Sequence, residues 1–184
     1  NVLECLNSTW ISSKGKFITQ FENSFSDYIG IKHSVAVCNG TVAIHVALLA
    51  LGIGDGDEVI VPSFTYIASV NAIKYTGAKP VFVDSNLITW QIDPQKIEEN
   101  ITSKTKAIMA VHLYGQPCEM DSIKKIADKH KLFLVEDCAE AFGSLYKARH
   151  VGTVGDIATF SFFGNKTITT GEGGMVVTND SSLN

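Results

Sequence analysis

Short apolar segments with the length of β-strands alternate along this chain with stretches that have helical periodicity. The strand-like segments are residues 33–37, 58–63, 79–84, 106–113, 132–138, 156–163 and 174–179. Such alternation is typical of α/β proteins, in which helices cover both faces of a mostly parallel sheet. The connection between the last two segments is too short for a helical crossover, so these two strands should be antiparallel neighbours. The sequence therefore predicts a three-layer α/β/α fold whose sheet has seven strands, six parallel and the seventh reversed.

Residues with known preferences for helix ends mark several of the predicted helices. Gly77 suits the C-terminal end of the helix after the second strand. Asp93 and Pro94 place a capping residue and a first-turn proline before "QKIEENI", residues 95–101, which is expected to be a helix. Asp121 is expected to cap a further helix over residues 121–131.

Bulk composition excludes several classes of protein. The chain has 184 residues, of which 45% are hydrophobic and 18% charged, so about one domain with a sizeable core is expected. A net charge of −4 argues against nucleic-acid binding, and no apolar run approaches the roughly 18 residues of a membrane span. The four cysteines form no CxxC pair, so we expect reduced thiols in a cytoplasmic protein and neither a metal site nor a disulfide framework.

The two ends of the sequence suggest a piece of a longer protein. The chain starts on "NVLECLNSTW", which has the character of a helix already under way, and stops shortly after the last strand. We expect residues 1–30 to be a helical and extended N-terminal segment. Residues 31–184 are expected to form an incomplete large-domain core.

Three groups with chemical potential follow strands that should run parallel, and ligands bind at the carboxyl ends of such strands. Asn39, Gly40 and Thr41 turn from the first strand directly into a helix, whose first-turn amides can bind an anion. Asp137 ends the fifth strand, beside Glu136; adjacent residues on a strand point to opposite faces, so only one of them can enter a cleft. The alternatives are a helix N-cap at Asn39 and a capping role for Asp137.

The third group is Lys166, which follows the sixth strand and precedes a glycine-rich segment. A nucleotide phosphate loop requires glycine directly before the lysine, whereas Asn165 stands there, so that motif is excluded. A lysine partly desolvated by Phe162 and Phe163 is a candidate nucleophile. The alternative is an ordinary surface lysine in a turn.

An amine, a carboxylate and a phosphate seat at neighbouring strand ends together match one ligand, pyridoxal 5′-phosphate (PLP). Lys166 would form the Schiff base, Asp137 would keep the pyridine nitrogen protonated, and the helix beginning at Gly40 would take the phosphate. Tyr66, just after the second strand, is expected to stack on the ring.

The sequence resembles the sugar aminotransferases of the DegT/DnrJ/EryC1/StrS family, which are fold-type I enzymes. The segments "CNGTVAIHVALLALGIGDGDEVIVPSFTYIASVNAI", "VHLYGQP", "VEDCAEAFGS" and "SFFGNKTITTGEGGMVVTND" carry the resemblance, which covers nearly the whole chain. It implies an aspartate-aminotransferase-like large domain, with the family's small C-terminal domain absent from this stretch. "STWISSKG", "YIASVNAIKYTGA" and "EDCAEAFGS" are similar to the branch that aminates GDP-4-keto-6-deoxymannose.

The resemblance implies a role for each matching residue. Lys166 is the Schiff-base lysine and Asp137 the partner of the pyridine nitrogen. The cofactor is further held by Gly40, Thr41 and Ser161 at its phosphate, by Tyr66 on the ring face and by Glu140 beside the ring 3-hydroxyl. At this last position Gln or His is commoner in the family. Trp10 and Ser12 are expected near the substrate or the partner subunit and His112 in the cleft, with a purely structural role as the alternative for each.

The resemblance further implies transfer of an amino group from L-glutamate to a nucleotide-linked 4-keto-6-deoxy sugar for polysaccharide biosynthesis, in a cytoplasmic homodimer with shared active sites. A related 3-dehydratase has His at the lysine position, so Lys166 favours amination. Two alternatives remain: another nucleotide-linked 4-keto-hexose as substrate, and a fragment without activity of its own.

Overall fold

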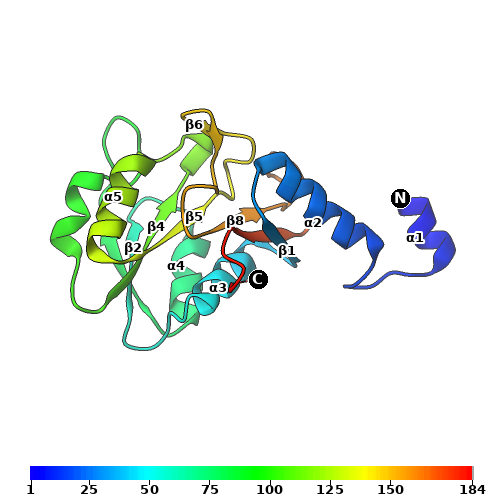
Figure 1. The fold of residues 1–184 in the computed structure, drawn as a ribbon, viewed down its shortest axis with the longest axis horizontal. Coiled ribbons are helices and arrows are strands. Elements are labelled where there is room, and N and C mark those ends of the chain that lie inside the picture. Colours follow the sequence, from blue (N-terminus) through cyan, green and yellow to red (C-terminus); the bar gives the residue numbers. More distant parts are fainter. Residues whose placement is uncertain (184) are drawn as a thin grey trace.

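A computed structural model, which describes residues 1–183, has seven strands in one sheet flanked by helices on both sides (Figure 1). The strands are β1 (His33–Val37), β2 (Glu58–Pro62), β3 (Lys79–Val83), β4 (Thr105–Val111), β5 (Phe133–Asp137), β8 (Ile157–Ser161) and β9 (Gly174–Thr178). Their order in the sheet is β1-β9-β8-β5-β4-β2-β3. Only β9 runs antiparallel to its neighbours, β1 and β8, so six strands share one direction as predicted.

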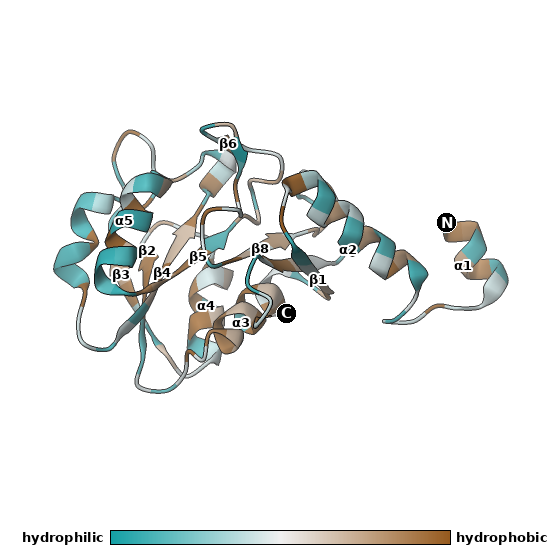
Figure 2. Ribbon diagram, viewed as in Figure 1, coloured by the Kyte–Doolittle hydropathy of each residue, from teal (hydrophilic) through white to brown (hydrophobic). Residues whose placement is uncertain are grey.

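The helices form two layers because successive strand residues point to opposite faces of the sheet. The helices are α1 (Val2–Ser8), α2 (Lys16–Ile29), α3 (Gly40–Ala50), α4 (Ile67–Tyr75) and α5 (Met120–His130). Val59 and Val61 of β2 pack with α3 and α4, whereas Ile60 between them packs with α5. Phe160 of β8 packs with α2 on a third part of the core. Figure 2 shows hydrophobic strands at the centre and a hydrophilic outer side of α5, so the predicted three-layer fold is confirmed.

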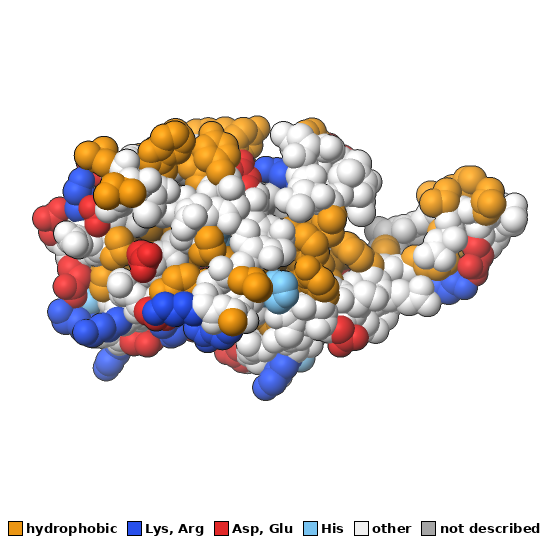
Figure 3. All heavy atoms as spheres, turned by 90° about the horizontal axis from the view of Figure 1, so that it is seen from above, with side chains coloured by type: hydrophobic (Ala, Val, Ile, Leu, Met, Phe, Trp, Pro, Cys, Tyr) orange, Lys and Arg blue, Asp and Glu red, His pale blue; other side chains and the backbone are white. Residues whose placement is uncertain are grey.

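The N-terminal arm, residues 1–15, lies apart from this body. Helix α1 buries none of its residues, and Figure 1 shows it displaced from the sheet beyond α2. Val2, Leu3 and Leu6 of α1 are exposed, and the space-filling view shows hydrophobic side chains on this separate lobe (Figure 3). Helix α2 returns to the body, where it buries Phe25 and Ile29. Within residues 1–183, no helix combines the length and apolar character needed to cross a bilayer.

Two of the three predicted helix ends are confirmed, whereas the third end and the type of one helix differ. Gly77 has the expected role, since it follows the last residues of α4 with a φ of +88°. Segment 95–101 is not an α-helix but lies in the 3₁₀ turns η1 (Pro94–Lys96) and η2 (Glu98–Asn100). The Asn100 N–H bonds to the Ile97 carbonyl, three residues back, and the Asn100 side chain donates to the Lys96 carbonyl that an α-helical N–H would use. Asp93 does cap η1 by accepting the Gln95 N–H.

The prediction that Asp121 caps α5 was wrong. The helix begins one residue earlier, at Met120, and Asp121 lies in its first turn with its carboxylate against Lys147. Lys147 belongs to a hairpin that the sequence did not reveal, formed by β6 (Leu145–Tyr146) and β7 (Arg149–His150). Its turn residues, Lys147 and Ala148, both have positive φ, and neither is one of the Gly or Asn residues that usually signal such a turn.

Candidate active site

A pocket of about 450 Å³ opens at the carboxyl ends of the parallel strands. All seven residues predicted to bind a cofactor line it: Gly40, Thr41, Tyr66, Asp137, Glu140, Ser161 and Lys166. They come from the starts of α3 and α4 and from the segments that end or follow β5 and β8. The parallel topology therefore gathers groups that are up to 126 positions apart (166 − 40) around one cavity.

The first turn of α3 forms one wall of the pocket. The Asn39 side chain caps the helix by accepting the Val42 N–H at 2.9 Å. The capping role and the anion-binding role are compatible, because the N–H groups of Gly40 and Thr41 also precede the first intrahelical bond. Gly40 lies directly against β8: a Cβ atom on it would stand 2.7 Å from the Cβ of Ser161. A side chain at position 40 is therefore excluded by packing.

Asp137 is the buried carboxylate of the pocket. It is 4% exposed, accepts a hydrogen bond from Ser69 Oγ at 2.7 Å and another from the Ala139 N–H at 3.1 Å. Burial raises the pKa of Asp137, although these two hydrogen bonds act in the opposite direction. Glu136 points away from the pocket, so strand alternation correctly predicted that one of the two acids enters it.

The amine of Lys166 faces a carboxylate across the pocket. Its Nζ lies 3.6 Å from Oε1 of Glu140, and the lysine side chain is 18% exposed. The other oxygen of Glu140 accepts the backbone N–H of Tyr114 at 2.9 Å. Lys166 is thus a mostly buried amine rather than an ordinary surface lysine.

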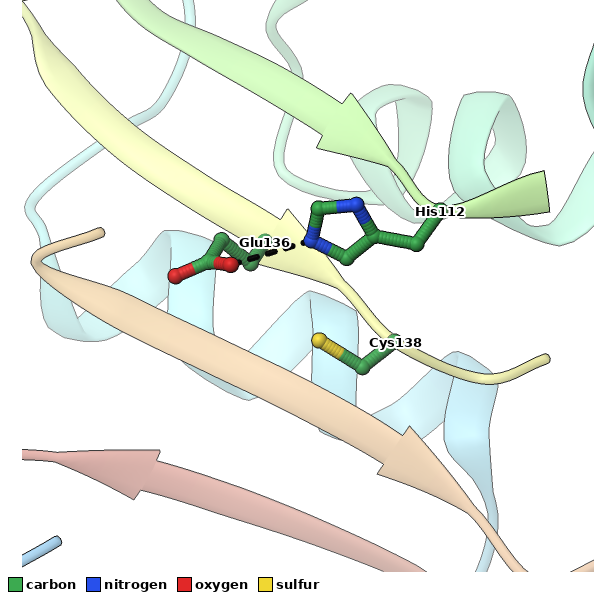
Figure 4. A group of neighbouring side chains, drawn as sticks. All are labelled: His112, Glu136 and Cys138. Atoms are coloured by element: carbon green, nitrogen blue, oxygen red, sulfur yellow. Dashed lines mark hydrogen bonds and ion pairs between the residues drawn. The ribbon is translucent and has the colours of Figure 1, made fainter. Parts of the chain in front are cut away.

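Glu136, His112 and Cys138 form a buried cluster behind the pocket that has the residue types of a metal site (Figure 4). His112 Nε2 lies 3.0 Å from Glu136 Oε2, while its Nδ1 accepts the Cys118 N–H. The proton of the imidazole is therefore on Nε2 and is donated to Glu136. Burial raises the pKa of the Cys138 thiol to about 12, so in the metal-free protein the thiol stays protonated.

The carboxylate of Glu136 is fully used by the protein itself. Besides His112, it accepts the backbone N–H groups of Gly152, Val154 and Gly155 at 2.6–2.8 Å. Burial disfavours the charged form, but the hydrogen bonds from His112 and from this backbone outweigh it and lower the pKa of Glu136. We interpret the cluster as a hydrogen-bond network that fixes the ends of β4 and β5 and the loop over residues 152–155.

The structure does not bring three of the expected substrate residues to the pocket. His112 is fully buried, and both its ring nitrogens are occupied in the network just described, so it does not line the cleft. Trp10 and Ser12 lie on the N-terminal arm and line a separate hollow, where the Trp10 indole N–H donates to the Lys14 carbonyl.

Ser69 was not predicted from the sequence to belong to the site, yet its hydroxyl bonds directly to Asp137. A signal was present: Ser69 follows Tyr66 by three positions at the start of a helix, and residues at this spacing share a face. Leu113 also lines the pocket, but nothing in its local sequence distinguishes it from a core residue.

For cofactor-free protein we expect Asp137→Asn to increase stability at neutral pH. Because the folded state raises the pKa of Asp137, ionisation of this group costs folding free energy above its unfolded value, near 3.8. The stability advantage of the asparagine variant should grow as pH rises from the unfolded pKa through the folded pKa and then level off. Thermal unfolding of both proteins between pH 4 and pH 8 measures this, and an advantage that is independent of pH would contradict it.

Comparison with known proteins identifies the family. The model of the DegT/DnrJ/EryC1/StrS aminotransferase family matches residues 1–184. The chain is 67% identical to GDP-perosamine synthase of Escherichia coli O157:H7, over 99% of its own length and 50% of that protein. It superposes with a TM-score of 0.96 and 47% identity on an aminotransferase from Psychrobacter cryohalolentis, covering 99% of this chain and 47% of that one.

A protein of Streptococcus pneumoniae, known in PLP, PMP and apo forms, is 34% identical, with a TM-score of 0.94 over 100% of this chain and 50% of that one. The chain thus spans about half the length of the relatives it matches. Its full length agrees with them in both sequence and fold, and it belongs to the DegT/DnrJ/EryC1/StrS aminotransferase family.

Proposed function

We propose that the protein containing this chain is a PLP-dependent aminotransferase and that the pocket at the strand ends binds the cofactor. The observation that carries the proposal is that Lys166, Asp137 and the first turn of α3 line a single cavity. The residues fit the group: within residues 1–183 the buried carboxylate of Asp137 forms no salt bridge, and such a carboxylate suits a pyridinium nitrogen. A helix start at which only glycine fits suits a phosphate.

Each lining residue then has a role. Asp137, held by Ser69, would pair with the ring nitrogen, while Gly40, Thr41 and Ser161 would bind the phosphate. Tyr66, 68% exposed at the rim, is free to cover the ring face. Glu140 would lie beside the ring 3-hydroxyl. When bound, PLP supplies the electron sink for the reaction.

Lys166 would attach the cofactor and then move the proton. Once a donor amino acid had displaced Lys166, the freed amine would be placed to take a proton from the α-carbon of the donor. It would then return that proton to the carbon to which the donor nitrogen has been transferred. Such general acid–base work contributes about 10²–10⁴-fold to a rate. Its position opposite Glu140 keeps the amine within the pocket during this exchange.

The substrate that we propose is GDP-4-keto-6-deoxymannose, with L-glutamate as donor and GDP-perosamine as product. Support comes from the E. coli relative, whose name states this product and whose identity to the chain is 67%. We further propose that the product serves O-antigen or a related polysaccharide, and that the enzyme is a cytoplasmic homodimer with shared active sites. Residues 31–184 would be the cofactor-binding core of the large domain and residues 1–30 a separate N-terminal segment.

Incubation with alternative keto sugars tests the substrate. The protein containing this chain is supplied with L-glutamate and, in separate reactions, with GDP-, UDP- and dTDP-linked 4-keto-6-deoxyhexoses, and the amino sugar is detected by mass spectrometry. We expect product from the GDP sugar. Product from another sugar alone would instead support the alternative of a different nucleotide-linked 4-keto-hexose.

Titration with PLP separates the enzyme from an inactive fragment. The 184-residue chain and the longer protein are each titrated while the visible absorption band of lysine-bound cofactor is followed. A band in the longer protein alone would indicate that this stretch needs further parts to bind the cofactor. No band in either would contradict the proposal.

Gly40→Ala should weaken phosphate binding and destabilise the protein. The added methyl group would overlap Ser161, and overpacking of this kind costs about 1–3 kcal/mol. We expect a similar loss in PLP affinity, measured by the same titration, because α3 must move away from β8. Gly164→Ala is a matched control, since a Cβ atom there meets nothing within 4 Å. Equal effects of the two substitutions would contradict the packing argument.

A further inference from the structure

Gln91 is a buried residue that does not line the pocket yet is hydrogen-bonded to its wall. It is 4% exposed and lies in the loop after β3. Its side-chain Oε1 accepts the Leu113 N–H at 3.0 Å, and its Nε2 donates to the Leu113 carbonyl at 3.2 Å. Nε2 also donates to the Thr89 carbonyl. Both N–H donors of this amide are therefore used, and Oε1 accepts the Leu113 N–H.

The two bonds to Leu113 fix the backbone just before a residue in a rare conformation. Tyr114 has a φ of +55°, which is unfavourable for a bulky side chain and persists only when the surroundings impose it. On the N-terminal side of Tyr114, the Gln91 side chain bonds to both the N–H and the carbonyl of Leu113. On its C-terminal side, Ser144 Oγ donates to the Gly115 carbonyl at 2.7 Å.

The conformation of Tyr114 directs its N–H to the pocket. This N–H donates to Oε2 of Glu140 at 2.9 Å, and Oε1 of the same carboxylate lies 3.6 Å from Lys166 Nζ. The contacts form a continuous chain from Gln91 through the Leu113–Tyr114 peptide and Glu140 to the amine. Without the Tyr114 N–H, Glu140 would lose the contact that orients its carboxylate toward Lys166.

We propose that Gln91 is a positioning residue of the active site, acting through the Tyr114 N–H and Glu140 to hold the Lys166 amine in place. The importance of this for transamination rests on the proposed function, whereas the chain of contacts does not depend on it. Gln91 does not line the pocket, and the route that we propose for its effect on Lys166 runs through the Leu113–Tyr114 peptide and Glu140.

A double-mutant cycle on cofactor-free protein tests the proposal. Gln91→Met keeps the length of the side chain and removes the amide, and Glu140→Gln removes the charge that faces the amine. Each variant and the double variant are treated with an amine-specific acylating reagent, and the labelling rate of Lys166 is measured by peptide mass spectrometry. Exposed Lys106 in the same sample is the internal reference.

We expect Gln91→Met to increase the relative labelling rate of Lys166 by about 3- to 10-fold, which lies within the range of coupling between residues in contact. An amine released from its carboxylate is more available to the reagent. In the Glu140→Gln background, Gln91→Met should add less than about twofold, because the same contact is already lost. Gln116→Met, at an exposed glutamine in the loop that contains Leu113 and Tyr114, should leave the rate unchanged.

Equal increases in both backgrounds, or no increase at all, would overturn the proposal, because a merely structural loosening does not depend on Glu140. If Gln91→Met fails to fold, Gln91→Glu replaces it, because the glutamate keeps an acceptor for the Leu113 N–H but has no donor for the Leu113 carbonyl. Hydrogen exchange at the Tyr114 N–H is then measured. Faster exchange than in the wild type supports the proposal, and unchanged exchange overturns it. Absence of PLP binding by the wild type would contradict the proposed function alone, since neither measurement involves the cofactor.

Discussion

Lys166→Ala is expected to abolish covalent attachment of PLP while leaving the fold intact. The side chain is partly exposed in the pocket and has one ion pair, so its loss costs little stability. Borohydride reduction of the wild-type complex should leave a pyridoxyl mass on the peptide that contains Lys166, and the variant should show none on any lysine. Loss of the general acid–base contribution should also reduce the transamination rate by at least about 10²-fold.

Lys124→Ala is a suitable control, because this lysine lies on α5 outside the pocket. It should retain both the pyridoxyl mass and the activity. A pyridoxyl adduct on another residue in Lys166→Ala would show that the assignment of the amine is wrong.

Glu136→Ala is expected to cause the largest loss of stability of any substitution considered. It would remove the acceptor of three backbone N–H groups and of the His112 imidazole, all at a side chain that is fully buried. Removal of one member of a buried charged network costs about 3–5 kcal/mol in the free energy of unfolding. Urea denaturation measures the loss, and Glu99→Ala, at an exposed glutamate, should change it by less than about 0.5 kcal/mol.

The same network predicts a pH dependence. Since the folded state lowers the pKa of Glu136, its charge contributes stability above the unfolded value near 4.5 and loses this contribution as pH falls through the folded pKa. The stability difference between the wild type and Glu136→Gln should therefore shrink on acidification. A difference that stays constant down to the acid limit of folding would argue that the carboxylate is not charged in the native protein.

Much of the site was predictable because it depends on local patterns. Strand alternation separates Glu136 from Asp137, and the position of Lys166 after an apolar strand indicates a desolvated amine. Gly40 precedes a helix directly after a strand, which is a local signature of an anion site. Parallel strand ends then bring these groups together, since the topology follows from the alternation of elements along the chain.

What could not be predicted depends on partners that are distant in sequence. His112 follows a parallel strand like the groups of the pocket, yet it is drawn into the core by Glu136, 24 positions later. Gln91 has the local sequence of an ordinary loop residue, and only its contacts with Leu113, 22 positions later, reveal its role. The hairpin turn at Lys147 and Ala148 has positive φ values that tertiary packing imposes without a glycine. Local propensity carries no information about such contacts.

The insertion of β9 between β1 and β8 has a consequence for the order of folding during synthesis. Residues 33–37 pair with residues 174–178, so within residues 1–183 the first strand gains its hydrogen-bonded neighbour only after residues 174–178 have been synthesised. Contacts so far apart in sequence form late and slow the search for the native state. Helix α3 begins shortly after β1. Gly174 of β9 packs against Asn39, the residue that precedes α3. The packing around the first turn of α3 is therefore completed only by β9, and until then the nascent chain carries an unpaired strand edge that a chaperone could shield.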